Sequence, residues 1–169
     1  MKQKQIEAIF THENHLCVVI FSRMGHRCGY VAVEKDSPLY KISYHENLNK
    51  PELLSELKQA KIDKRGLLSV FCWNGESTSP EILFNVHGGI TYSGGNCYPI
   101  TRSRQLWWFG FDCAHYDDRK DLDKYYEYFK KKPESYISIM NSGVIRTEEY
   151  VAQECKNLAE QIACVESIY

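Results

Sequence analysis

The chain has 169 residues, 43% of them hydrophobic and 13% aromatic, which suits a single domain with one core. Its 21 Lys and Arg against 22 Asp and Glu argue against binding of long nucleic acid, because each phosphate contact favours a cation. No apolar run approaches the roughly 20 residues that span a bilayer, and no secretory signal opens the chain, so we expect a cytoplasmic protein without membrane contact and with reduced thiols.

The first half of the chain begins with a predicted β-hairpin. The β-branched residues 15–22 and residues 29–34 flank a turn with two glycines, which predicts a pair of antiparallel strands. Residues 35–51 are loop-like, residues 51–62 have the apolar spacing of a short helix, and residues 67–73 form a further predicted strand.

The second half mixes strands and helices. We predict strands at residues 81–89 and 105–114 and a helix at residues 117–132. A last helix follows Thr147, a good N-cap. Its apolar residues repeat in fours and threes: Val151, Cys155, Leu158, Ile162 and Val165.

The predicted fold is α+β: one domain with a mostly antiparallel sheet and two or three helices. The long C-terminal helix packs on this sheet or on a second subunit, which leaves a homo-oligomer open.

A glycine-rich stretch, NVHGGITYSGG, surrounds His87. Glycines let a ligand approach the backbone closely, and Thr91, Tyr92 and Ser93 add three hydroxyl groups that suit a phosphate or a sugar. Taken alone, the glycines are explained more simply by a hairpin turn with a hydrogen-bonded histidine.

A second polar stretch, GFDCAHYDD, follows the longest aromatic run. Asp112 and His115 are close enough to converge in a turn, and with His87 they could transfer protons or bind a divalent metal. The alternative is that Asp112 caps the turn and His115 lies on the surface. Cys113, between them, is expected to be a buried thiol.

Two further residues are candidate ligand contacts. His26 lies at the predicted hairpin turn and could face the same cleft, although a solvated side chain explains it as well. Arg146 precedes the last helix, where it could bind a phosphate or form a surface ion pair. The sequence contains no G-x-S-x-G elbow, P-loop or G-x-G-x-x-G motif.

Five segments resemble a widespread family of small phage and prophage proteins. They are GHRCGYV, SPLY, VHGGITYSGG, LWWFGFDCAH and RTEEYVAQECKNLAEQI, and the resemblance that they mark extends over about two thirds of the chain. The family pattern has a G-H-x-x-G-Y-V turn, an H-G-G-[IL]-T-[YF]-S block and a W-W-[FI]-G-F-D-C-A-H-x-x-D block. This chain has Tyr116-Asp117-Asp118 where the family has Ala-Gly-Asp, and residues 44–81 form a longer segment, which we interpret as an insertion that could be a lid or an oligomer contact.

The resemblance implies that His87, Asp112, His115 and Asp118 share one site. It also implies four neighbours of that site: Tyr30, Thr91, Tyr92 and Trp108.

A phage-linked role suggests counter-defence in the cytoplasm of an infected bacterium. The ligand would be a small nucleotide-derived signal, cyclic or derived from NAD, which the protein captures or cleaves. In the cleaving form His87 and His115 would be general base and acid, while Asp112 would orient an imidazole. Asp118 would position water or a metal, and Tyr92 and Trp108 would stack on a base. The alternative function is a protein-binding inhibitor or accessory protein without small-molecule chemistry.

Overall fold

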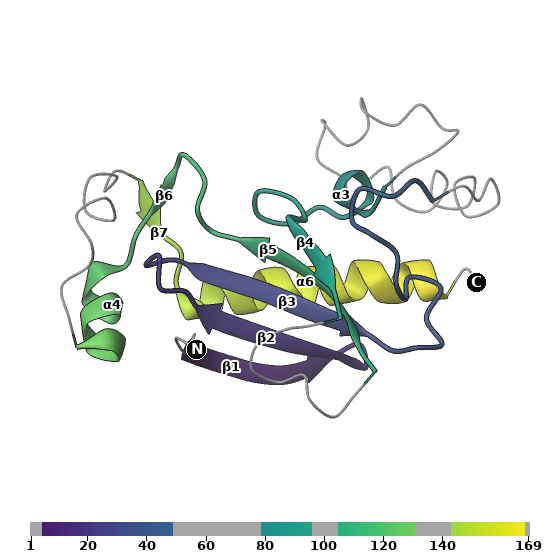
Figure 1. The fold of residues 1–169 in the computed structure, drawn as a ribbon, viewed down its shortest axis with the longest axis horizontal. Helices are drawn as coiled ribbons and strands as arrows, with labels where there is room; N and C mark the ends of the chain where they lie inside the picture. The colour runs from purple at the N-terminus through teal and green to yellow at the C-terminus, as the bar shows by residue number, and fades with distance from the viewer. Residues whose placement is uncertain (1–4, 49–78, 96–104, 131–142, 168–169) are drawn as a thin grey trace.

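A five-stranded antiparallel sheet forms the centre of the fold (Figure 1). The computed structural model describes residues 5–48, 79–95, 105–130 and 143–167. In sheet order the strands are β1 (Gln5–His12), β2 (His15–Phe21), β3 (Arg27–Val33), β5 (Trp107–Asp112) and β4 (Tyr92–Gly94). Helix α6 (Glu148–Glu166) lies along one face of this sheet (Figure 1). The predicted α+β class is confirmed.

The predicted hairpin of residues 15–34 is confirmed as β2 and β3, which pair antiparallel with Cys17 opposite Val31. The sequence reading missed β1, which pairs with β2 across a tight turn. Glu13 and Asn14 both have positive φ there, 47° and 62°, as a two-residue hairpin turn requires. The apolar alternation of β1 is broken by Ile9, which is exposed, so its strand signal is weak.

The apolar stripe of the last helix packs against the sheet of the same chain. All five predicted stripe residues are buried, and they share one core with residues of β2, β3 and β5. At Gly29 of β3 a Cβ would lie 2.7 Å from the Cys155 sulfur and 2.4 Å from the Phe111 ring, so the glycine permits this close packing. This core accounts for the stripe without a second subunit.

The predicted strand at residues 81–89 is wrong. Residues Pro80–Leu83 form the short helix α3, with Pro80 in its first turn, where proline is favoured. The chain beyond α3 is held by side chains of α6: Gln161 accepts from the Asn85 amide (2.8 Å) and donates to its carbonyl (2.9 Å). These contacts satisfy backbone groups that a neighbouring strand would otherwise bind.

The predicted helix at residues 117–132 is shorter than expected. The first residues of the predicted helix instead form strand β6 (Asp118–Arg119), which pairs in parallel with β7 (Val144–Ile145). Helix α4 then spans Leu122–Phe129, with the Asp121 carboxylate accepting from the Lys124 amide as its N-cap.

Two predicted elements, the helix at 51–62 and the strand at 67–73, lie outside the described residues. The ends of the 44–81 segment are adjacent, since the Glu81 amide donates to the Tyr44 carbonyl at 2.9 Å. Within the described ranges, no helix is long and apolar enough to cross a membrane.

Candidate functional site

Three segments that are distant in the sequence meet near the start of α6. One is the turn at residues 86–89, closed by the Gly89 amide and the Val86 carbonyl. The second is the turn at residues 115–118, closed by the Asp118 amide and the His115 carbonyl. The third is Arg146, which the β6–β7 pairing brings beside Asp118.

Asp118 is the centre of the site. Its side chain is 1% exposed, and Oδ1 accepts from Arg146 Nε at 2.8 Å. Its Oδ2 accepts from His87 Nε2 at 2.7 Å and from the His115 amide at 3.0 Å. Burial by itself raises the pKa of this carboxyl, but the hydrogen bonds from Arg146 and His87 outweigh it and leave the pKa below its ordinary value. Asp118 is therefore an ionised acceptor.

His87 is held through both ring nitrogens. Because the Asp118 carboxylate can only accept, Nε2 carries the proton and Nδ1 accepts from the Tyr150 hydroxyl at 3.0 Å. The His87 amide also donates to Glu154 of α6 at 2.8 Å. Tyr150 and Glu154 lie one helical turn apart, so one face of α6 fixes both the ring and the backbone of His87.

Gly88 makes room for His115. It has a φ of +67°, and a Cβ on it would lie 1.7 Å from His115 Nε2. The His115 ring thus rests on the glycine backbone, with its centroid 5.4 Å from that of His87. The His115 side chain is 38% exposed, which makes it the accessible imidazole of the pair.

Asp112 lies at the edge of the site. Its Oδ2 accepts from the Thr91 hydroxyl at 2.9 Å, and its Oδ1 is 4.0 Å from His115 Nε2. The four acid and histidine residues expected from the sequence are thus brought together, with Asp118 rather than Asp112 orienting an imidazole.

The aromatic residues expected in the site lie elsewhere. Tyr30 and Tyr92 contact each other edge to face, with centroids 5.7 Å apart. They pack with Trp108 on the sheet face opposite α6. Trp108 is fully buried, so the expectation that it stacks on a base is wrong. Trp108 of β5 is thus part of the core and does not line a pocket.

Two other predicted ligand contacts, Ser93 and His26, lie in defined places of the fold. The Ser93 hydroxyl accepts from the Tyr44 amide at 2.9 Å. The His26 backbone lies in the β2–β3 turn as expected, where its carbonyl accepts from the Ser22 amide at 2.8 Å. Cys113 is buried as expected, and burial, followed by the nearby Asp118 charge, raises the pKa of its thiol. A thiol in that environment is a poor nucleophile.

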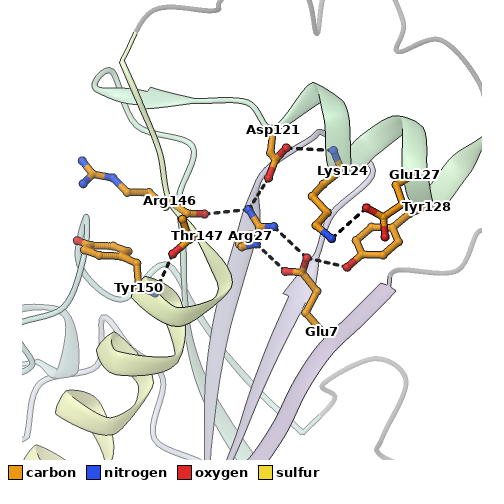
Figure 2. Close-up of polar contacts among 9 residues, drawn as sticks. All are labelled: Glu7, Arg27, Asp121, Lys124, Glu127, Tyr128, Arg146, Thr147 and Tyr150. Carbon is orange, nitrogen blue, oxygen red and sulfur yellow. Dashed lines mark hydrogen bonds and ion pairs between the residues drawn. The ribbon is translucent and has the colours of Figure 1, made fainter.

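A buried ion network around Arg27 holds the backbone carbonyl of Arg146 (Figure 2). Arg27 of β3 pairs with Glu7 of β1 (2.6 Å) and Asp121 at the start of α4 (2.9 Å). Its Nη1 also donates to the Arg146 carbonyl at 3.0 Å. In Figure 2 the Arg146 and Tyr150 side chains point away from this network, and the guanidinium lies over the Tyr150 ring at 5.0 Å.

Sequence reasoning missed Tyr150, Glu154 and the supporting role of Arg27. The positions of Tyr150 and Glu154, one and two turns into a helix with Thr147 as its N-cap, were the available signal. Nothing in their spacing indicated that His87 would be the partner.

The same site has a donor set suited to a metal ion. His87, His115 and Asp118 can each offer one ligand atom, and these atoms lie within 4.8 Å of one another. Two imidazoles and one carboxylate suit a divalent transition metal.

A scan of protein-family models and searches of curated proteins and solved structures each found no match to this chain.

Proposed function

We propose that this chain captures or cleaves a small nucleotide-derived phosphate, bound beside His115 and Arg146, as a phage-type counter-defence protein. The ligand class is a cyclic nucleotide or an NAD-derived signal. The observation that supports the proposal best is the convergence of an Asp118-held His87, an accessible His115 and Arg146 on one side of the α6 start.

Arg146 and His115 provide the anion contacts. Arg146 stays charged and has several guanidinium donors, and its hydrogen bond to Asp118 uses Nε. His115 adds an imidazole that solvent can reach. Together they suit a ligand with one to three phosphates, which needs only a few local donors and no basic surface.

Tyr116 replaces Tyr92 and Trp108 as the aromatic contact in this proposal. It follows His115 directly and is 91% exposed, an unusual environment for a large aromatic side chain. Stacking of a base on an exposed aromatic ring contributes about 1–3 kcal/mol.

Hydrolysis cannot use both imidazoles as a direct base and acid pair. His87 has Asp118 on one ring nitrogen and Tyr150 on the other, so it has no nitrogen left for the ligand. Proton transfer by His115, or a metal ion held by these residues, are the two routes that remain open.

The test is to incubate the protein with a panel of cyclic dinucleotides and cyclic ADP-ribose isomers. Free ligand is removed, the protein is denatured, and the released molecules are identified by mass spectrometry. Intact ligand indicates capture, and fragments indicate hydrolysis. Retention should fall about tenfold or more in Tyr116→Ala, which loses the stacking contact. Tyr126→Ala, which removes an exposed tyrosine of α4, is the matched control.

The proposal would be contradicted if the protein neither retained nor cleaved any ligand of the panel. If the biological effect also survived in His115→Ala, the protein-binding alternative would be favoured.

A further inference from the structure

We infer that His87, His115 and Asp118 bind one divalent transition metal ion of the Zn²⁺ class. Their ligand atoms already lie within 4.8 Å of one another, although His87 comes from a different turn than His115 and Asp118. The inference deepens the proposed function, on which its catalytic meaning rests, because the ion would lie where the phosphate is proposed to bind. The binding of the ion itself can be measured without that ligand.

The chemistry of the donors selects the ion. Imidazole nitrogens suit Zn²⁺ and its first-row neighbours, whereas Mg²⁺ and Ca²⁺ prefer oxygen ligands throughout. Three protein ligands leave coordination positions for another molecule, as in catalytic zinc sites rather than closed structural ones. The exposure of His115 gives such a molecule access to the ion.

The orientation of Asp118 leaves the required oxygen in place. Arg146 occupies Oδ1, while Oδ2 faces His87 Nε2 at 2.7 Å. A metal ion would replace the proton on His87 Nε2, and that proton would move to Nδ1, so the imidazole keeps one N–H. The Tyr150 hydroxyl would remain at Nδ1 and would then accept a hydrogen bond from it, as outer-shell groups on ligating histidines commonly do.

Arg146 opposes cation binding, because its charge lies on the same carboxylate. One carboxylate, one guanidinium and a divalent ion sum to a positive site. Asp112, whose Oδ1 is 4.0 Å from His115 Nε2, offsets part of this charge from the other side. The remaining positive charge favours an anionic ligand over a neutral one, which matches the phosphate of the proposed function.

The experiment uses the full chain without an affinity tag, stripped of metal by a chelator. Calorimetry with Zn²⁺ measures stoichiometry and affinity, and visible absorption after Co²⁺ addition reports the ligand types. We expect one ion per chain and a Co²⁺ spectrum of nitrogen and oxygen ligands. His115→Ala should weaken binding by at least about 100-fold, and Tyr150→Phe by about 10-fold.

His45→Ala is the matched control, since it removes an exposed histidine elsewhere and should leave the affinity unchanged. His115→Ala removes an accessible side chain, so circular dichroism should show an unchanged fold. Absence of stoichiometric binding, equal affinity in His115→Ala, or a strong thiolate-to-cobalt band would overturn the inference. Because no nucleotide is present, failure here leaves the retention assay free to succeed, and the reverse also holds.

Discussion

Asp118 orders the candidate site because it is buried and yet surrounded by donors. A buried carboxylate is tolerated only when it is paired, and Arg146, His87 and the His115 amide all donate to it. The carboxylate fixes the His87 tautomer and brings Arg146 to the same point. Asp112, at the edge, has one hydroxyl donor and a distant imidazole.

Gly88 and Gly89 provide a paired test of how the turn positions His115. Alanine at either position costs about 1–2 kcal/mol, because both residues have positive φ, +67° and +85°. Only at Gly88 would the new Cβ meet His115, while it finds nothing within 4 Å at Gly89. Gly88→Ala should therefore displace the His115 ring, and Gly89→Ala should not.

Urea unfolding measures the loss of stability that both variants share. Nuclear magnetic resonance chemical shifts of the His115 ring carbons report the position of that ring, because it lies beside the His87 ring. Equal His115 shifts in the two variants would show that the glycine backbone does not position the ring.

His15, which lies outside the candidate site, should make the stability of the protein depend on pH. Its Nε2 lies 3.3 Å from Glu166, which also accepts from Ser37. Burial lowers the pKa of His15, but the hydrogen bond to Glu166 and the charge of Glu166 outweigh burial, so the pKa lies above its ordinary value of 6.5. Burial raises the pKa of Glu166, and the bonds from His15 and Ser37 bring it below 4.5.

The stabilisation by His15 is complete below pH 6.5 and disappears as pH rises through its folded pKa. The stabilisation by Glu166 is present above pH 4.5 and disappears as pH falls through its folded pKa. The loss of unfolding free energy in Glu166→Gln should thus be largest between pH 4.5 and 6.5. Glu160→Gln, which breaks the more exposed pair with His12, is the control and should show a smaller effect. A loss that does not change with pH would rule out this ion pair as the cause.

At the scale of elements, α6 organises the site as well as the core. One face packs on the sheet through the apolar stripe, and the adjoining side chains of Tyr150, Glu154 and Gln161 hold the segment from Asn85 to His87. A helix that only covered a sheet would not need these polar contacts.

Arg27 joins β1, β3, α4 and Arg146, which lies just before the N-cap of α6, and the side chains of Arg27 and Glu7 are buried. Arg27→Met should lower the free energy of unfolding by about 3–5 kcal/mol, because it leaves the Glu7 carboxylate buried without the Arg27 cation. Urea denaturation measures the loss. The double variant Glu7→Leu with Arg27→Met should lose less than the two single variants summed. A cost below about 1 kcal/mol for Arg27→Met would show that the network carries little energy.

At the scale of the whole molecule, the sequence predicted those elements whose signal is local. The β2–β3 hairpin, β5 and α6 have clear periodicity, caps or turns, and each was found. Residues 81–89 have the composition of a strand, but Pro80 starts the short helix α3 and the Gln161 side chain of α6 binds the backbone at Asn85. Contacts between distant segments, such as β6 with β7, leave no local pattern to read.

The candidate site was predictable in its members more than in their roles. His87, Asp112 and His115 are predicted as acids and imidazoles next to glycines and a strand end, and Asp118 joins them through the family pattern that the sequence resembles. Which carboxylate orients which ring depends on the β6–β7 pairing and on α6, and neither is visible in the spacing. The long aromatic run did not indicate which ring is accessible: Trp108 packs into the core, while Tyr116 is exposed.

The most direct measurement is nuclear magnetic resonance of the histidine rings while a ligand selected by the retention assay is added. We predict that the His87 and His115 ring resonances shift with ligand concentration, because the phosphate binds between Arg146 and these imidazoles. His12, which pairs with Glu160, and His45, which is exposed elsewhere, should keep their resonances. Retained ligand that leaves His87 and His115 unshifted, or shifts confined to His12 and His45, would contradict a phosphate site at the start of α6.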